Sequence, residues 1–212
     1  TATATISESG NNPAATVQAN TTAGLSIITY TGTGSEGTIA HGLGASPKMI
    51  WVKNRDAGEG WIVDSRLLTG NSNGTLHFNT DAEYTGGSNQ FGTHSSTNIT
   101  IKTAGNINTD GQKYEAYVFA PIQGYSKFGT YTGNANADGP FVYTGFKPAW
   151  IMAKSTTATA SWTILDNKRD PFNVTTKRLF ADEDTAESDS TSGNTDFLSN
   201  GFKIRTSHSG IN

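Results

Sequence analysis

Short apolar runs alternate with turn-forming clusters along almost the whole chain. The runs are rich in Val, Ile, Thr, Tyr, Phe and Trp, and the clusters between them, such as residues 70–74 and 85–89, are rich in Gly, Asn, Ser and Thr. β-Branched and aromatic residues favour strands, whereas Gly, Asn and Ser favour turns. In the first half of the chain this pattern predicts six strands, over residues 25–30, 48–53, 61–64, 75–79, 98–102 and 113–120.

Strands at this spacing favour two antiparallel sheets that pack face to face as a β-sandwich. In residues 48–53 the apolar side chains are nearly continuous, as expected for a central strand that is covered on both faces. We expect the core to contain apolar residues from these strands and from their counterparts later in the chain, namely Ile50, Val52, Ile62, Phe119, Ile151, Ile164 and Ile204.

The chain contains an internal repeat. The motif Tyr-Thr-Gly at residues 30–32 recurs 101 residues later, at residues 131–133, and towards the end of the chain the offset drifts to 103. Each unit spans about 100 residues, which is too long for a solenoid repeat and indicates two complete domains in tandem. The residues that we expect to be structurally equivalent are Pro47 with Pro148 and Trp61 with Trp162.

The predicted fold is all-β, with two tandem antiparallel β-sandwich domains of jelly-roll-like type. Residues 1–23 read as an extended N-terminal arm or the end of a preceding domain, residues 24–122 as the first sandwich and residues 123–212 as the second. The second repeat stops before a counterpart of residues 113–120, so we expect it to lack its last strand and the polypeptide to continue past Asn212. The edge left open should be covered by that continuation or by a neighbouring subunit.

The amino-acid composition and net charge exclude several classes of function. The net charge of −3 provides no basic surface for binding nucleic acid through its phosphates. The absence of Cys excludes disulfides, thiolate metal sites and cysteine nucleophiles. No apolar stretch is long enough for a membrane-spanning helix, and we expect no secretory signal because no charged segment with an apolar core opens the sequence.

The sequence offers little catalytic chemistry. It has neither a G-x-S-x-G elbow nor a phosphate-binding P-loop, and its four His residues are scattered without metal-ligand spacing. The acidic stretch 182–196 is a solvated loop or, as the less favoured reading, a calcium loop without EF-hand order. Asp64 and Asp166 each follow a strand led by Trp, where turn capping or ion pairing explains them. We expect no enzyme, no metal site and no cofactor.

Aromatic residues are the remaining candidates for binding. The four Trp residues, Trp51, Trp61, Trp150 and Trp162, read as core or inter-sheet packing, with a ligand platform as the alternative. Aromatics in or near the predicted loops are candidate surface contacts, with packing or burial between subunits as the competing explanation; they are Tyr84, Phe91, Tyr125 and Tyr143.

Several motifs together resemble a domain of uncharacterised function that is common in virion proteins of marine tailed bacteriophages, often described as tail fibres or structural proteins. The similarity extends over residues 24–212 and is carried by the segments 29–34, 41–44, 47–55, 124–133, 138–143 and 196–205. The resemblance implies a virion location, on the exterior of the particle, and a homo-oligomer, with a trimer favoured. It transfers no catalytic residue.

The leading functional prediction is a non-enzymatic virion structural protein, part of a tail fibre or surface appendage that presents rigid β modules for host contact. A capsid decoration protein and a carbohydrate-binding module that recognises host surface glycans are the alternatives. A glycan-cleaving enzyme would need two carboxyl groups held across a groove, and the sequence cannot place Asp64, Glu83 or Asp166 in that way. Expected partners are other copies of the chain, other virion proteins and a host glycan, but neither nucleic acid nor membrane.

Overall fold

A computed structural model describes residues 3–69, 74–83, 85–86 and 89–212 of the chain. Strands contain 38% of the residues and helices 5%, so the predicted all-β class and the near-absence of helix are confirmed. The chain divides into two compact units, one formed by Thr1–His77 and Thr85–Phe128 and the other by Phe78–Tyr84 and Gly129–Asn212. No helix within the described ranges is long and apolar enough to cross a membrane.

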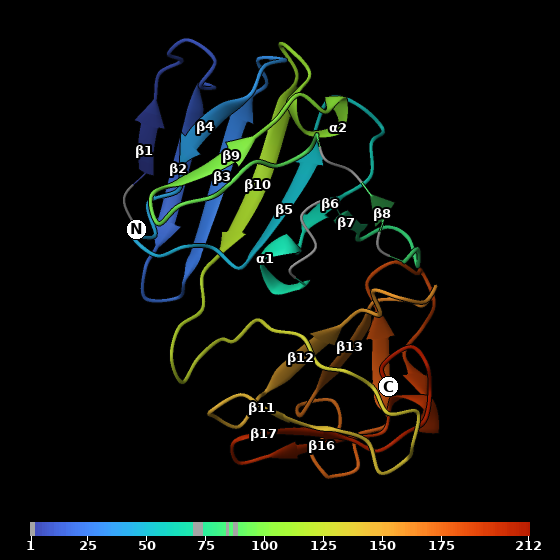
Figure 1. Cartoon of the computed structure of the whole chain (residues 1–212). Coiled ribbons are helices and arrows are strands. Elements are labelled where there is room, and N and C mark those ends of the chain that lie inside the picture. Colours follow the sequence, from blue (N-terminus) through green and yellow to red (C-terminus); the bar gives the residue numbers. More distant parts are fainter. Residues whose placement is uncertain (1–2, 70–73, 84, 87–88) are drawn as a thin grey trace. The chain divides into compact units, whose positions relative to one another are not determined.

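The first unit is built on one large antiparallel sheet (Figure 1). Its central strand is β10 (Lys113–Phe119), which pairs with β3 (Leu25–Thr31) on one side and with β5 (Met49–Asn54) on the other. The sheet order is β1-β2-β3-β10-β5-β6-β7-β8. The outer strands are β1 (Thr3–Ile6), β2 (Ala15–Asn20), β6 (Ile62–Asp64), β7 (Gly74–His77) and β8 (Thr85–Gly86).

The N-terminal residues are part of this sheet and do not form a separate arm. Strand β2 pairs along its whole length with β3, and β1 adds to β2. The expectation of an arm over residues 1–23 was wrong because the segment's low hydrophobicity reflects a strand with a single buried face. In β2, Ala15 and Val17 are buried in the core and Ala19 packs against it, whereas the alternate residues Thr16, Gln18 and Asn20 are exposed.

A second layer covers one face of the sheet. It consists of β4 (Gly37–Ala40) and β9 (Asn98–Ile101), which pair with each other and lie across the large sheet in Figure 1. Two one-turn helices, α1 (Arg66–Thr69) and α2 (Gly105–Asn108), occupy the connections. The core of this sandwich-like unit lies between the two layers and contains Ile28, Ile39, Ile50, Val52, Ile62, Phe91, Ile99, Ile101, Ile107, Tyr114, Ala116 and Val118.

Burial alternates strictly along the central strands, as period-two geometry requires. In β10, Tyr114, Ala116 and Val118 are buried, whereas Tyr117 and Phe119 lie on the opposite, half-exposed face. The predicted core positions Ile50, Val52 and Ile62 are therefore correct. Phe119 was assigned to the wrong face, because the apolar run in β10 hides which alternate residues point inward.

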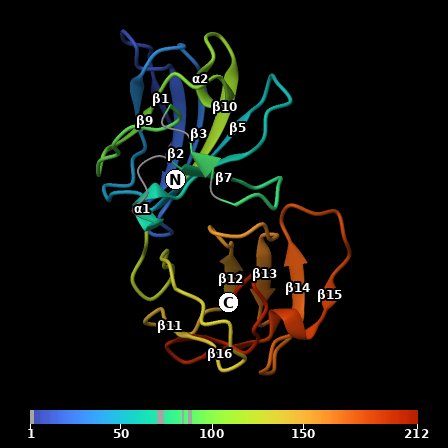
Figure 2. The same ribbon diagram turned by 45° about the vertical axis from the view of Figure 1, so that its right-hand side comes forward.

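The second unit contains two antiparallel sheets. One is the meander β12 (Trp150–Ala153), β13 (Thr163–Asp166), β14 (Lys177–Phe180) and β15 (Ser188–Asp189), seen side by side in Figure 2. The other has the order β11-β17-β16, formed by β11 (Phe141–Tyr143), β17 (Gly201–Ile204) and β16 (Thr195–Leu198). A single 3-10 turn, η1 (Thr191–Gly193), precedes β16.

The core of the second unit is small. It comprises Ile151, Leu165, Phe197, Phe202, Ile204 and Ile211, with Tyr131, Val142 and Ala153 packed against it. The predicted core residues Ile151 and Ile204 are buried, but Ile164 is only half-buried, because its neighbour Leu165 is the residue of β13 that points inward. Several large apolar side chains of this unit are instead exposed, namely Phe141, Tyr143, Trp150, Phe172, Val174 and Leu179.

Candidate functional site

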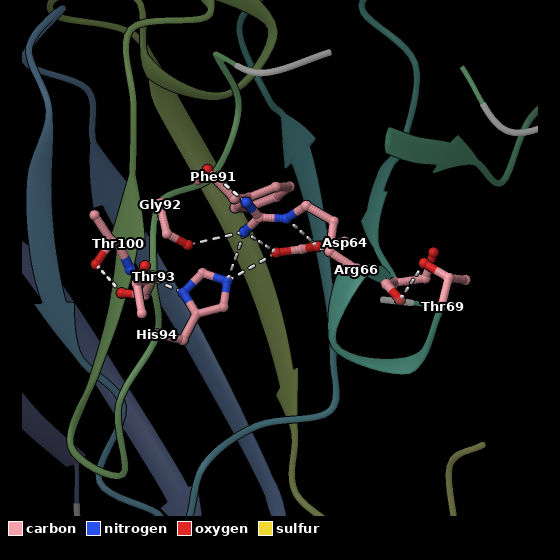
Figure 3. A network of polar contacts seen from close by, with 9 residues as sticks. Asp64, Arg66, Thr69, Phe91, Gly92, Thr93, His94 and Thr100 are labelled. Carbon is pink, nitrogen blue, oxygen red and sulfur yellow. Dashed lines mark hydrogen bonds and ion pairs between the residues drawn. The ribbon is translucent and has the colours of Figure 1, made fainter. Parts of the chain in front are cut away.

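A polar network of the first unit lies where β6 ends and α1 begins (Figure 3). The carboxylate of Asp64 is buried and receives both the Nε and an Nη of Arg66, at 2.8 and 2.7 Å. It also accepts the backbone N–H of Arg66 at 3.1 Å, so it caps α1. The remaining guanidinium donors reach the carbonyl oxygens of Phe91 and Gly92, both at 2.8 Å. Arg66 therefore ties α1 to the segment that precedes β9.

His94 completes this network, and both of its ring nitrogens are used. The backbone N–H of Thr100 donates to Nδ1 at 3.0 Å, so the ring proton lies on Nε2. Nε2 then donates to Asp64 Oδ2 at 2.8 Å. In a Ser-His-Asp arrangement the second ring nitrogen must face a nucleophile, but here it faces a backbone amide. Asp64 and His94 are the residue types of a catalytic pair, but both ring nitrogens of His94 are already hydrogen-bonded, so neither is available as a base.

The electrostatics of Asp64 support a structural role. Burial opposes ionisation of this carboxyl, but the hydrogen bonds from Arg66 and His94 and the charge of Arg66 outweigh it, and the pKa of Asp64 is lowered. A buried carboxylate stabilises the fold only while its partners are present, because removing a partner leaves a buried charge uncompensated and lowers the free energy of unfolding. The network holds the end of β6, α1 and residues 91–94 together.

A similar pair lies at the end of β13 in the second unit. Asp166 accepts the backbone N–H groups of Lys168 and Arg169, both at 2.9 Å, and the Nε of Arg169 at 2.6 Å. Burial opposes ionisation of Asp166, but these bonds prevail and lower its pKa. Arg169 also pairs with Glu187, at 3.0 Å. The predicted turn-capping and ion-pairing roles of Asp64 and Asp166 are confirmed.

A second polar arrangement of the first unit is the Tyr30 corner, formed by Tyr30, Thr33, Ile107 and Asn108. The Tyr30 hydroxyl donates to the carbonyl oxygen of Ile107 at 2.6 Å, and Asn108 Oδ1 accepts the backbone N–H of Thr33 at 2.9 Å. The amide of Asn108 donates to two further carbonyl oxygens. The ring of Tyr30 stacks on Tyr114 of β10, with centroids 5.0 Å apart.

The second unit has a Tyr131 corner, formed by Tyr131, Asn134, Ile211 and Asn212. The Tyr131 hydroxyl donates to the carbonyl oxygen of Ile211 at 2.6 Å, and Asn212 Oδ1 accepts the backbone N–H of Asn134 at 2.7 Å. The amide of Asn212 also donates to two carbonyl oxygens, those of Asn136 and Thr206. Tyr131 packs edge-on against Phe202.

The predicted surface aromatics do not form one site. Phe91 is 2% exposed and belongs to the core of the first unit, where Arg66 lies over its ring, so it cannot be a surface contact. Its position beside turn residues suggested exposure, but the segment folds back and bridges to β9. Tyr125 and Tyr143 are 65% and 59% exposed and lie in different units. Tyr84 lies outside the described residues.

The predicted repeat-equivalent residues occupy comparable places along their strands. Pro47 and Pro148 are both buried and lie two residues before β5 and β12. Trp61 and Trp162 directly precede β6 and β13. Trp162 is buried against Phe78, as expected for a packing residue, and Trp61 is half-buried. Trp150 is 52% exposed, so its expected core role was wrong.

The outer face of the large sheet carries a group of aromatics that we call the outer aromatic row: Trp61, Tyr117, Trp51, Phe119 and Phe128. Neighbouring rings lie with centroids 4.4–6.3 Å apart, and Tyr117 pairs directly with Trp51 across β10 and β5. All five side chains are half-exposed. In the sequence, Tyr117 and Phe119 are two residues apart and so share one face of β10, but the apolar residues on both faces do not show which face points inward.

A shallow hollow of about 400 Å³ in the first unit is bordered by Asn20, Thr22, Ala23, Ile122 and the exposed Tyr125. In the part of the chain that the structure describes, no three His, Asp or Glu side chains converge as metal ligands would. In the acidic stretch, Asp182 accepts the backbone N–H of Trp162 and Asp196 pairs with Arg205.

Two further histidines are also engaged in backbone contacts. Nδ1 of the buried His41 accepts the N–H of Leu43, and Nδ1 of His208 accepts the N–H of Gly210. Burial lowers the pKa of His41, which favours the neutral ring. These imidazoles act as acceptors that shape turns.

Comparison with known proteins gives a family without a known role. The whole chain, residues 1–212, matches a family described as a domain of unknown function (DUF7483), and the chain belongs to that family. No curated protein and no solved structure matches it.

Proposed function

We propose that the chain is a non-enzymatic structural module of a phage virion, part of a tail fibre or surface appendage. The observation that carries the non-enzymatic part is the state of the Asp64–Arg66–His94 network. This is the most enzyme-like cluster among the described residues, and each of its hydrogen-bonding groups already holds a strand, a helix or a backbone amide. The virion location rests on the resemblance of the sequence motifs.

We further propose that the two units are tandem copies of one sandwich. The Tyr30 and Tyr131 corners support this, because hydroxyl, carbonyl and carboxamide partners recur in the same order. Sheet connectivity supports it as well, since the meander β5-β6-β7-β8 has the same succession as β12-β13-β14-β15. The pairing of β4 with β9 likewise parallels that of β11 with β17. Rigid modules of this kind suit an elongated homo-oligomer.

Antibodies raised against the chain test the proposed location. Immunogold labelling of intact virions should decorate a tail appendage, and a particle reconstruction should place the chain there with the symmetry of its oligomer. Labelling of the capsid would favour the decoration alternative. Absence of the chain from purified virions would overturn the proposed location.

A second candidate function is glycan binding by the outer aromatic row. Half-exposed rings that lie side by side offer apolar surface on which the faces of sugar rings can pack. A glycan array probed with the full chain should give ligands whose binding is lost in Trp51→Ala. The matched control is Phe172→Ala, which removes an exposed ring of the other unit. Equal binding by both variants would exclude the row as the sugar site.

A further inference from the structure

Two buried histidines hold one loop of the first unit. We call residues 91–97, which lead into β9, the layer loop. His41 directly follows β4, is 0% exposed, and has its Nε2 3.3 Å from the carbonyl oxygen of Ser95 in this loop. His94 belongs to the loop itself, and its Nε2 donates to Asp64 at the end of β6 (Figure 3). The layer loop is therefore fixed both to β4 and to the large sheet.

Both rings accept a hydrogen bond from a backbone amide. The N–H of Leu43 donates to Nδ1 of His41 at 3.2 Å, and the N–H of Thr100 donates to Nδ1 of His94 at 3.0 Å. A ring nitrogen that accepts a hydrogen bond carries no proton, since a charged imidazolium has two N–H donors and no acceptor. Protonation of either ring would therefore place a second donor against an amide that already donates.

The two rings differ in the charges around them. A carboxylate oxygen of Asp64 lies 2.8 Å from Nε2 of His94, and a guanidinium nitrogen of Arg66 lies 3.4 Å from the same atom. A proton on His94 would gain an ion pair with that carboxylate, although it would lose the bond from the amide of Thr100. A charge on His94 would thus have a partner.

A charge on His41 would have no such partner. Within the described residues its Nε2 faces the carbonyl oxygen of Ser95, and no carboxylate pairs with the ring. A charge on His94 would repel it, and Glu36 lies beside Gly92 at the start of the layer loop. Burial lowers the pKa of His41, and the hydrogen bond to Ser95 opposes this effect only in part. The closed unit therefore keeps the ring neutral, and His41 takes up a proton more readily once the loop opens to water.

The layer loop holds a small covering layer in place. β4 and β9 have four residues each and form a two-stranded sheet of their own. The backbone N–H of His41 extends their pairing, because it donates to the carbonyl oxygen of Thr97 at 3.0 Å. Ile39, Ile99 and Ile101 of these strands are at most 1% exposed and pack in the core of the first unit. Displacement of the loop would uncover these side chains and leave the pairing of β10 with β3 and β5 intact.

We infer that His41 is an acid-sensitive latch: when it gains a proton, the β4–β9 layer opens away from the core while the large sheet stays folded. The proton binds Nδ1, the hydrogen bond from Leu43 is lost, and water solvates the new charge in the open form. Mild acid would in this way uncover apolar surface on the first unit. The latch is part of the unit's own packing, so the inference does not depend on where the chain is located.

Amide hydrogen exchange of the full chain between about pH 7.5 and about pH 5 tests the inference, with each rate corrected for the intrinsic effect of pH on exchange. The informative amides are those of Ile39 and Ile99, which pair within the layer, and of Leu43, which donates to the ring. Below the ordinary His pKa of 6.5, their opening equilibrium constant should rise by up to about tenfold per pH unit, because the open form takes up one proton. The amides of β3 and β10 should stay protected.

The variant His41→Asn tests the latch itself. The Asn carboxamide oxygen can accept the N–H of Leu43 in place of Nδ1 but takes up no proton in this pH range, so the layer should stay closed at about pH 5. His208→Asn is the matched control. Nδ1 of His208 also accepts the N–H two residues ahead, from Gly210, but at an exposed position of the second unit. The layer of this control should open as in the wild type, and circular dichroism at neutral pH verifies that both variants are folded.

The wild-type chain gives a second readout that needs no folded variant. In an NMR titration, the ring signals of His41 should change to the charged form together with the loss of protection at Ile39 and Ile99. The same pH dependence in His41→Asn as in the wild type would overturn the inference, as would a ring that becomes charged while the layer stays protected. Opening that begins only below about pH 4 would assign the response to carboxyl groups such as Asp64, and would overturn it as well.

Discussion

The Tyr131 hydroxyl donates a hydrogen bond of 2.6 Å to the carbonyl oxygen of Ile211, across 80 residues of sequence. Tyr30 makes the same bond to Ile107 in the first unit, also at 2.6 Å. In the first unit the bond joins β3 to α2, and in the second unit it joins Tyr131 to the turn at residues 208–211. Because a phenol can donate only while it keeps its proton, both links depend on pH.

The stability of the second unit should fall at alkaline pH. Burial raises the pKa of Tyr131 to about 12. Between pH 10 and 12 the unfolded chain releases this proton and the folded chain keeps it, so the stabilisation present below pH 10 is lost as the pH rises. A difference of two pKa units between the folded and the unfolded chain corresponds to about 2–3 kcal/mol in the free energy of unfolding. Urea unfolding of the second unit at pH 9 and pH 12 should show this difference, and Tyr131→Phe should reduce it. An unchanged pH dependence in Tyr131→Phe would contradict the assignment.

The close approach at the Tyr131 corner should not tolerate a methyl group. A Cβ on Gly133 would clash with the carbonyl carbon of Asn212, so Gly133→Ala should cost about 1–3 kcal/mol through overpacking. Gly129→Ala, four residues earlier, would meet no atom within 4 Å and is the matched control. Thermal unfolding of the two variants measures the difference. Equal melting temperatures would refute the packing of this corner.

Asp64→Asn should destabilise the first unit strongly. The substitution leaves Arg66 without its carboxylate in a largely buried setting, for which the expected cost is about 3–5 kcal/mol. The wild-type stabilisation should be complete above the pKa of an unfolded Asp and be lost as the pH falls through the lowered pKa of Asp64. In Asp64→Asn this acid-dependent loss should be smaller. Denaturant titrations at several acidic pH values measure this loss in the wild type and in Asp64→Asn. Glu8→Gln, a change at an exposed position, is the control.

Adjacent residues of β13 provide a test of its phase. Leu165 is 2% exposed and belongs to the core, so Leu165→Ala should cost about 2–5 kcal/mol. Ile164 is half-buried on the other face, and Ile164→Ala should cost clearly less. Equilibrium unfolding of both variants decides between the two orientations. A larger loss for Ile164→Ala would mean that the strand faces the other way.

Much of the fold could be predicted from local pattern. The six strands predicted in the first half all exist, with ends that differ from the prediction by at most two residues, because turn residues bound them clearly. It was harder to predict which face of each strand points into the core. In β10 and β13 both faces carry apolar residues, so periodicity alone could not decide between Val118 and Phe119 or between Leu165 and Ile164.

The polar networks were beyond prediction from local sequence. Asp64, Arg66 and His94 meet only because β6 and the segment before β9 are adjacent in the fold. The spacing of these residues in the sequence does not predict the contact. The outer aromatic row was within reach, since Trp51 alternates with the core residues Ile50 and Val52. It was missed because the aromatic residues on strands were assigned to packing and those in loops to binding.

The position of β10 in the sheet has a consequence for how the first unit folds during synthesis. β3 and β5 come early in the sequence but do not pair with each other; within the sheet they are joined through β10, whose last residue is Phe119. The nascent chain can pair β1 with β2 and β2 with β3 by short hairpins, yet its sheet remains split into two parts until β10 leaves the ribosome. Contacts between distant segments slow folding because the intervening loop must close first. The Tyr, Ile and Val side chains of the two halves would stay uncovered during that interval, so a chain stalled before residue 113 should be a substrate for chaperones.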